Sequence, residues 1–232
     1  MNDQVVIVTG GGRGIGQAIC RRFAEAGAQV VAAARSEDQL DRTKQIIEQD
    51  GGRCATIAVD VSSTDRLQYL ISSTERRFGR IDVLINNAGV SACGPVKDLT
   101  TVDFETMMRV NVAAVFYACK FVWPIMQRQG SGVIINISSM ATEDSCPGLG
   151  TYAASKAWVT TFTRGLADEG RELGIRAFAI GPGAVWTDML RENSPTFPEQ
   201  DALDPMHIAD VAYALCQPAM TYAAGQTFYV RK

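Results

Sequence analysis

The stretch that decides the fold is Val5-Val-Ile-Val-Thr-Gly-Gly-Gly-Arg-Gly-Ile-Gly16, which continues as Gln17-Ala-Ile-Cys-Arg-Arg-Phe-Ala-Glu-Ala26. Its first residues are apolar enough for a buried strand, and its last ten repeat apolar residues at helical spacing. The glycines between them let the backbone pass close to a ligand, and the first amides of the helix offer donors to a phosphate. We therefore predict a strand, a phosphate-binding turn and a helix, although a simple tight turn uses the same glycines.

The next segment indicates which dinucleotide such a turn would bind. Residues 28–34 predict a second strand, and Arg35 and Ser36 follow it. Folds of this kind often place an acidic residue there, which binds the 2'-hydroxyl of the adenosine ribose. A guanidinium at this place, together with Arg13, suits a 2'-phosphate and favours NADP(H) over NAD(H). Arg35 also fits a solvated residue that is neutralised by the acidic start of the next helix.

Helices and strands alternate along the rest of the chain. We expect helices at residues 37–49, 64–78, 103–129, 152–173 and 208–216, and strands at residues 54–59, 81–85, 132–138, 175–180 and 226–230. Pro124 is expected to bend or end the long helix in which it lies. The alternation predicts an α/β fold with one Rossmann-type domain at residues 1–232, a doubly wound and mostly parallel seven-stranded sheet with helices on both faces.

The composition excludes several classes of function. The chain has 232 residues, 47% hydrophobic and 20% charged, with a net charge of -3. No basic surplus is present to neutralise phosphates, so we expect no nucleic-acid partner. The N-terminal apolar run is too short for a signal peptide or a membrane span, so we expect no membrane partner. The six cysteines are scattered without Cys-x-x-Cys spacing, which indicates reduced thiols in a cytoplasmic protein.

His207 is the single histidine of the chain. A Ser-His-Asp hydrolase or a multi-histidine metal site would depend on this one residue, which stands in a segment typical of the surface at a helix start. We therefore expect no metal, and we expect the chemistry to use Tyr, Ser, Lys or a cofactor.

Tyr152 and Lys156 are four residues apart in a segment with helical periodicity, so their side chains project from one face of a helix. A phenol titrates near ~10 in water, and a neighbouring ammonium favours the phenolate and lowers this pKa. The pair therefore suits a general acid or base at neutral pH. The same spacing also occurs on solvated helix faces, so the other motifs decide between these interpretations.

These motifs occur in an order that resembles the short-chain dehydrogenase/reductase family over essentially the whole chain. The strongest subgroup resemblance is to the 3-oxoacyl-(acyl carrier protein) reductase-like members. The matching residues are Thr9-Gly-Gly-Gly-Arg-Gly-Ile-Gly16, Asp60-Val61, Asn86-Asn-Ala-Gly89, Asn111, Ser139, Tyr152-x-x-x-Lys156 and Pro182-Gly183.

The resemblance implies roles for four catalytic residues. Tyr152 would protonate a carbonyl oxygen while NADPH delivers hydride, and would act as the base in the reverse direction. Lys156 would lower the pKa of the phenol and bind the nicotinamide ribose. Ser139, rather than its neighbour Ser138, would hold the substrate oxygen. Asn111 would support a water relay to the lysine, and a buried amide that satisfies helix backbone at a kink is compatible with that role.

The resemblance also implies a set of cofactor contacts in addition to Arg35, Ser36, Tyr152 and Lys156. The remaining residues are Gly10, Gly14 and Gly16 at the pyrophosphate, Gly12, Arg13 and Ile15 in the same turn, Asp60 and Val61 at the adenine, Asn87, Ala88 and Gly89 at the ribose, and Pro182, Gly183, Val185 and Thr187 at the nicotinamide. Asp60 alternatively fits a turn residue at the end of a strand.

The chain departs from the family pattern at three places. Gly181 replaces the asparagine that usually precedes Pro-Gly, the region 188–205 makes only a short substrate lid, and the usual Asp-Gly-Gly ending is missing. That ending often contributes to subunit packing in the usual tetramer, so its absence favours a homodimer through the long helices beside the homotetramer as the expected assembly. The residues that could line an apolar pocket, and that equally fit core or lid packing, are Cys93, Met140, Trp186, Met189, Leu190 and Phe197. No basic cluster clearly marks a docking site for an acidic carrier protein, for which Arg128 and Arg171 are the candidates.

Together these features predict an NADP(H)-dependent oxidoreductase that interconverts a carbonyl and a secondary alcohol of a small molecule, with a 3-oxoacyl thioester as one candidate substrate. Two alternatives remain open. One is a non-catalytic dinucleotide-binding sensor or scaffold on the same fold, since fold does not fix function. The other is an NAD-dependent alcohol or sugar dehydrogenase.

Overall fold

A computed structural model describes residues 1–144 and 146–232, and within these residues seven strands form one sheet in the order β3-β2-β1-β4-β5-β6-β7. Every neighbouring pair of strands is parallel. The strands are β1 (Val5–Thr9), β2 (Gln29–Ala34), β3 (Arg53–Ala58), β4 (Val83–Asn86), β5 (Gly132–Ile137), β6 (Ile175–Pro182) and β7 (Thr227–Val230). The predicted doubly wound sheet is confirmed.

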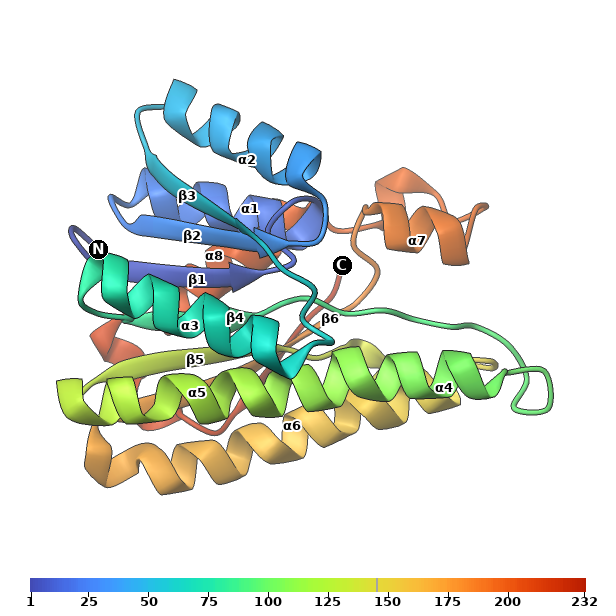
Figure 1. The fold of residues 1–232 in the computed structure, drawn as a ribbon. Coiled ribbons are helices and arrows are strands. Elements are labelled where there is room, and N and C mark those ends of the chain that lie inside the picture. The colour runs from blue at the N-terminus through green and yellow to red at the C-terminus, as the bar shows by residue number, and fades with distance from the viewer. Residues whose placement is uncertain (145) are drawn as a thin grey trace.

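Helices cover both faces of this sheet. Helices α1, α2 and α8 lie on one face, α3, α5 and α6 lie on the other, and α7 stands beyond the carboxyl ends of the strands (Figure 1). Their bounds are α1 Gly14–Glu25, α2 Glu37–Gln49, α3 Thr64–Phe78, α4 Thr101–Met107, α5 Ala114–Gln129, α6 Gly150–Gly170, α7 Asp188–Asn193 and α8 Pro205–Leu215. Short 3₁₀ helices occur at Met140–Thr142, Arg171–Leu173, Glu199–Asp201 and Pro218–Ala223.

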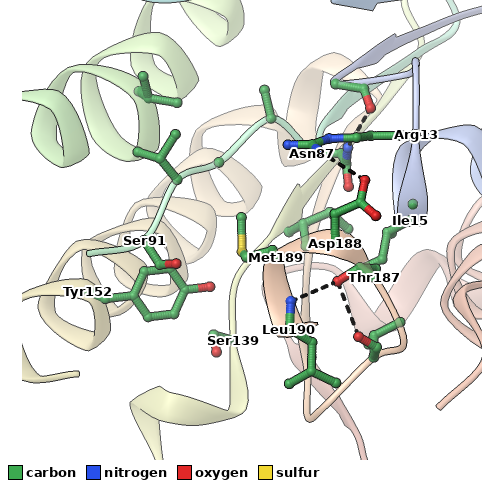
Figure 2. Close-up of a pocket in the computed structure, with 18 of the residues that line it drawn as sticks. Arg13, Ile15, Asn87, Ser91, Ser139, Tyr152, Thr187, Asp188, Met189 and Leu190 are labelled. Atoms are coloured by element: carbon green, nitrogen blue, oxygen red, sulfur yellow. Dashed lines mark hydrogen bonds and ion pairs between the residues drawn. The ribbon is translucent and has the colours of Figure 1, made fainter. Parts of the chain in front are cut away.

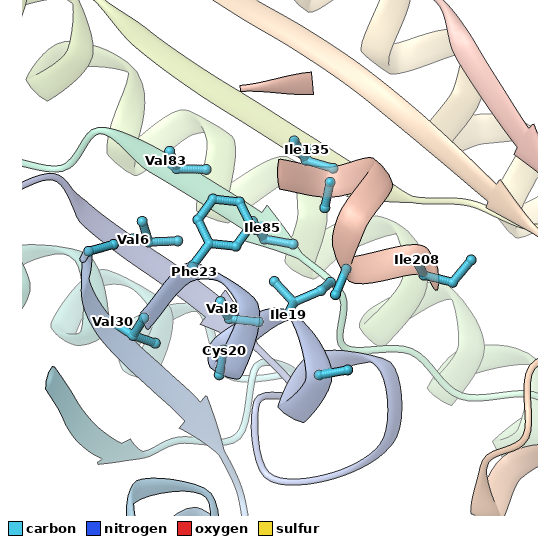
Figure 3. Packing of buried hydrophobic residues seen from close by; sticks show 14 of the residues in the cluster. Val6, Val8, Ile19, Cys20, Phe23, Val30, Val83, Ile85, Ile135 and Ile208 are labelled. Atoms are coloured by element: carbon cyan, nitrogen blue, oxygen red, sulfur yellow. The ribbon is translucent and has the colours of Figure 1, made fainter. Parts of the chain in front are cut away.

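The first strand is buried on both faces, which explains its unbroken apolar sequence. Alternate side chains of a strand point to opposite faces, so Val6 and Val8 pack with Phe23 of α1 and Ile208 of α8. Figure 3 shows this cluster, in which the Phe23 ring lies against the side chains of the central strands. Val5 and Ile7 join the cluster on the opposite face, with residues of α3, α5 and α6.

Most of the α-helices α1 to α8 begin at a residue whose side chain caps the first turn. Five of their N-cap side chains accept a hydrogen bond from a backbone amide of the helix that they begin, namely Ser36, Ser63, Thr100, Thr187 and Asp204. Helix α1 differs, because its N-cap residue Arg13 makes no such bond. The first amides of α1 are therefore open to another acceptor.

The long helix expected at residues 103–129 is divided. Helix α4 passes into a π-helix at Met108–Ala113 and then into α5, which continues through Pro124 to Gln129. The expectation that Pro124 ends the regular part is wrong. Proline removes the donor to the carbonyl four residues earlier, and that residue, Lys120, is exposed to water, which can replace the donor.

This helical region, Thr101–Gln129, is long and apolar enough to cross a membrane by length and composition. Half of its most apolar window is buried inside the protein. Ala118, Val122 and Met126 pack in the core cluster beneath the sheet, so packing in the core accounts for the apolar character of this helix.

Candidate active site

A cleft of about 810 Å³ opens at the carboxyl ends of the strands. The strand order reverses between β1 and β4, and ligands of doubly wound sheets bind outside the strand ends at this point. The cleft is lined by the residues that follow β1, β2, β3, β4, β5 and β6. It contains every predicted site residue except Gly16 and Asn111, which lie directly behind its wall.

Asn87 ties the two turns that meet at this reversal. Its side-chain amide donates to the carbonyl oxygens of Thr9 at 2.9 Å and Gly10 at 3.3 Å. The hydroxyl of Thr9 accepts hydrogen bonds from the backbone amides of Asn87 and Ala88. The side-chain nitrogen of Asn87 thus holds the glycine turn, so a ribose contact would use its other polar atoms.

The glycine turn leaves space that a side chain would fill. Gly10 and Gly14 have positive φ angles of 68° and 54°, which favour glycine. A Cβ on Gly16 would lie 2.1 Å from the carbonyl oxygen of Gly10, so only glycine lets α1 approach the turn. With the open amides of α1 above it, this cradle fits a pyrophosphate.

At the far end of the cleft, Arg35 is exposed after β2 and faces the segment that follows β3. Burial acts to raise the pKa of Asp60, but hydrogen bonds from Ser62 and the charges of Arg35 and Arg109 outweigh it and lower that pKa. The Ser36 hydroxyl caps α2. Arg35 is therefore placed as a cation beside the expected adenosine position.

Tyr152 lies in the first turn of α6, and Lys156 lies one turn later. The Lys156 Nζ atom is 5.9 Å from the centre of the Tyr152 ring and donates to the carbonyl oxygen of Ile137 at 2.8 Å. Figure 2 shows the phenol of Tyr152 and the hydroxyl of Ser139 facing the same space, which Met189 borders. The carboxyl end of β5 and the first turns of α6 thus bring the predicted acid, cation and serine together.

Burial dominates the protonation of both groups. Burial raises the pKa of Tyr152 above its ordinary value, and a hydrogen bond with Ser139 acts to lower it. Burial lowers the pKa of Lys156 from 10.5 to about 8. The pKa of the phenol is thus shifted opposite to the direction expected from its lysine neighbour. A protonated phenol is the form that donates a proton to a carbonyl oxygen.

The structure distinguishes the two neighbouring serines. The Ser138 hydroxyl is buried, donates to the carbonyl oxygen of Lys156 at 3.1 Å and contacts the hydroxyl of Thr160 at 2.9 Å. The Ser139 hydroxyl accepts from the amide of Ala141 at 3.1 Å and faces the cleft. Ser138 thus fastens α6 to β5, and Ser139 is the serine that a substrate can contact.

Asn111 is fully buried in the π-helix. Its side-chain oxygen accepts from the amide of Val90 at 2.9 Å, and its nitrogen donates to the Val90 carbonyl at 2.8 Å and to the Ser155 hydroxyl at 3.0 Å. The amide therefore bonds to the loop after β4 and to α6, not to the backbone of its own helix. A Cβ on Gly89 would lie 3.3 Å from Lys156 Nζ and 3.4 Å from Asn111 Oδ1, so this glycine lets the loop pass beside both.

Helix α7 is held over the cleft at both ends. Asp188 forms an ion pair with Arg13 of the glycine turn at 2.9 Å and another with Arg191. At the other end, the Asn193 side chain donates to the hydroxyl of Ser91 at 2.6 Å. The sequence predicted a lid here but no helix, and the Thr187 cap was its local signal. The Ser91 contact has no sequence signal, because its partners are 102 residues apart.

The lid also corrects several expectations. Arg13 lines the cleft but forms an ion pair with Asp188. Arg35 takes part in none of the ion pairs of the described residues, so it is the candidate that is free to bind a 2'-phosphate. Of the expected apolar pocket residues, Met189, Leu190 and Cys93 line the cleft. The other three, Met140, Trp186 and Phe197, do not line it.

The two arginines considered for carrier docking lie at the wrong end of the molecule. Arg128 is paired with Glu75 at 2.6 Å near the end of α5, and Arg171 is paired with Asp168 at 2.9 Å after α6. Tyr152 lies at the opposite end of α6, roughly 28 Å away at the rise of an α-helix. Neither arginine borders the cleft.

Comparison with known proteins agrees with this geometry. Residues 4–197 match the family described as short chain dehydrogenase. The 7alpha-hydroxysteroid dehydrogenase of Escherichia coli (strain K12) is 34% identical over 99% of this chain and 93% of its own length. A structure of a 7alpha-hydroxysteroid dehydrogenase with NADH and 7-oxo glycochenodeoxycholic acid superposes with a TM-score of 0.93.

Two further solved structures are similar over nearly the whole chain. Levodione reductase has a TM-score of 0.94 and 30% identity, covering 100% of this chain and 97% of its own. An actinorhodin polyketide ketoreductase with NADPH has a TM-score of 0.93 and 28% identity, covering 98% and 95%.

The chain belongs to the short-chain dehydrogenase/reductase family. It is an oxidoreductase of the NAD(P)-dependent dehydrogenase/reductase class, built on the nucleotide-binding fold that its sequence predicted.

Proposed function

We propose that this enzyme reduces a small apolar ketone with NADPH and oxidises the corresponding secondary alcohol in reverse. The observation that carries the proposal is one continuous cleft, which joins the glycine cradle to Tyr152 and Ser139. The cradle is suited to the phosphates, and the two hydroxyls are suited to a carbonyl oxygen. The whole arrangement lies at the strand ends where this fold binds dinucleotides.

The chain's own residues would orient the substrate and supply the proton. The Ser139 hydroxyl would donate a hydrogen bond to the carbonyl oxygen and stabilise the negative charge that develops there. Bound nicotinamide supplies the hydride to the carbonyl carbon. The Tyr152 phenol would transfer its proton to the oxygen and complete the alcohol. Lys156 would stabilise the phenolate that remains, and Asn111 would hold the loop beside it.

The test of this mechanism is Tyr152→Phe, which removes only the acidic hydroxyl. The expected result is a loss of turnover of about 10²-fold or more, with an unchanged dissociation constant for NADPH measured by fluorescence titration. Tyr213→Phe, on α8 away from the cleft, is the matched control. A Tyr152→Phe enzyme with a near-normal rate would refute the role. A wild-type protein that binds both cofactors but turns over no ketone would support the sensor or scaffold alternative.

The preference for NADPH rests on Arg35. Arg35→Ala should raise the dissociation constant of NADPH about tenfold and leave that of NADH nearly unchanged, because only NADPH carries the 2'-phosphate. Arg42→Ala, an exposed arginine of α2, is the control. An equal loss for both cofactors, or tighter binding of NADH by the wild type, would reject this preference and favour the NAD-dependent alternative.

The substrate end of the cleft indicates a free apolar ketone. Met189, Leu190, Leu149 and Val90 border this end, and Ser91 adds a polar group at the lid. The relatives named above include a hydroxysteroid dehydrogenase, levodione reductase and a polyketide ketoreductase. A panel of cyclic ketones, diketones and 3-oxoacyl thioesters, followed by loss of NADPH absorbance, tests this choice. Turnover of the thioesters alone would overturn it.

We also propose a homodimer through α5 and α6, in an enzyme of the cytoplasm. Phe116 is 40% exposed and contacts the ring of Phe162 on α6 across the two helices, and Trp158 stacks on Phe162 at 4.6 Å. Phe104 of α4, which precedes α5 in the same helical region, is 50% exposed. A continuous aromatic face of this kind is typical of subunit interfaces. Sedimentation of the wild type and of Phe116→Glu tests the proposed dimer. We expect a dimeric wild type and a monomeric variant. A monomeric wild type would refute the dimer.

A further inference from the structure

Tyr229 of β7 occupies the space beside Gly181 of β6. The two residues are register partners in the parallel pair. A Cβ on Gly181 would lie 2.4 Å from Cδ1 and 2.6 Å from Cε1 of the Tyr229 ring, so no larger residue fits at position 181 while the ring is there. The same Cβ would lie 3.5 Å from the backbone carbon of Ser139. The Tyr229 ring and the backbone of Ser139 thus both lie next to Gly181.

The Tyr229 hydroxyl is bonded to that same turn. It donates its one hydrogen to Glu143 Oε1 at 2.7 Å. The Thr142 hydroxyl shares its one hydrogen between two acceptors, the Tyr229 oxygen at 2.9 Å and the carbonyl oxygen of Ser139 at 2.9 Å. Through Thr142, hydrogen bonds thus join the last strand of the sheet to the backbone of Ser139.

The other bonds of this turn are local. The amide of Thr142 donates to the Ser139 carbonyl at 3.3 Å, and the amide of Glu143 donates to the Met140 carbonyl at 2.9 Å. Such bonds fix the shape of a turn. The residue before the turn is tied to the sheet, because the amide of Ser138 donates to the carbonyl oxygen of Ile180 at 2.6 Å. Tyr229 ties the far end of the turn, because its backbone belongs to β7 and its hydroxyl contacts Thr142 and Glu143.

We infer that Tyr229 is a positioning residue for Ser139, acting through Thr142 and Glu143. The inference rests on the proposed reductase function only for its effect on rate. A hydroxyl that stabilises developing charge must be held near its productive position, and such groups act mainly in the transition state. Loss of the Tyr229 hydroxyl should therefore lower kcat and leave the KM of the ketone and the binding of NADPH nearly unchanged.

Tyr229→Phe tests this, since it keeps the ring against Gly181 and removes only the hydroxyl. We expect kcat to fall about tenfold, the consequence of one or two lost hydrogen bonds. Tyr222→Phe is the control, because Tyr222 is fully exposed on the 3₁₀ helix before β7. A kcat within twofold of wild type in Tyr229→Phe would overturn the inference.

Thr142 provides a second test with its own rescue. Thr142→Val should lower kcat as Tyr229→Phe does, Thr142→Ser should restore it, and the double variant should be little worse than either single change. Equal loss in Thr142→Val and Thr142→Ser, or full additivity in the double variant, would contradict the hydrogen-bonded chain.

Hydrogen exchange separates this inference from the proposed function. In Tyr229→Phe the amides of residues 141–143 should exchange faster than in wild type and in Tyr222→Phe, whether or not a ketone is turned over. Unchanged exchange would overturn the link between β7 and the turn. An inactive wild type whose exchange responds as expected would refute the reductase function and leave the link intact.

Discussion

Lys156→Met should make the protein more stable at neutral pH while abolishing turnover. Lys156 is only 4% exposed, and burial lowers its pKa from 10.5 to about 8. The folded protein therefore holds the ammonium less readily than the unfolded chain does. The difference between these pKa values corresponds to about 3 kcal/mol of destabilisation when the lysine is charged. Methionine fills a similar volume without a charge.

The pH dependence follows from the sign of this shift. Below pH 8 the lysine is charged in both states and the full cost is present. Between about pH 8 and 10.5 the unfolded chain binds more protons than the folded protein, so the stability of the wild type rises with pH relative to the variant. Methionine also loses the bond to the Ile137 carbonyl, which costs about 1 kcal/mol. The expected net gain at pH 7 is about 2 kcal/mol.

Urea unfolding of wild type and Lys156→Met at pH 7, 8, 9 and 10 measures this difference. Lys120→Met, at an exposed position of α5, is the control and should change the free energy of unfolding little at any of these pH values. The reasoning is refuted by a difference that stays constant from pH 7 to pH 10, or by a variant that is less stable than wild type at pH 7.

Two further changes test the cradle and the lid. Gly16→Ala should weaken NADPH binding at least tenfold in a titration, because its Cβ would lie 2.1 Å from the Gly10 oxygen. The control is Gly165→Ala in α6, where a Cβ meets open space. This change should increase the free energy of unfolding by about 0.5–1 kcal/mol. Asn193→Ala should raise the KM of the ketone about threefold to tenfold with kcat nearly unchanged, because the lid loses one hydrogen bond. The control Glu192→Ala should leave KM unchanged. An unchanged KM in Asn193→Ala would show that the lid bond does not act on the substrate.

Features with local signals were predicted closely. Helices α2 and α3 have the predicted bounds, and each begins at a serine whose side chain caps the first turn. The first strand and the glycine turn were also predicted, since an apolar run and a close backbone approach leave clear marks in a sequence. These elements required no knowledge of distant contacts.

Features that depend on distant contacts were missed. The Asn111 side chain in the π-helix bonds to Val90 in the loop between β4 and α4, and nothing near Asn111 in the sequence indicates this contact. The upward shift in the pKa of Tyr152 depends on how deeply α6 is buried, and the spacing to Lys156 indicated only the charge beside it. Trp186 lies between Val185 and Thr187 of the nicotinamide segment, but its side chain is not part of the cleft wall.

The ladder of buried amides beneath the site has a further consequence. Asn86 of β4 donates to Asn136 of β5 at 2.8 Å, and Asn136 donates to the Thr163 hydroxyl of α6 at 2.9 Å. These bonds fix the position of α6 along the sheet. A shift of α6 by one helical turn would break the bond to Thr163 and move Tyr152 about 5.4 Å along the helix axis. The lid, in contrast, is attached by exposed polar contacts at its rim. Substitutions in α7 can therefore change the rim of the cleft without moving α6 or Tyr152.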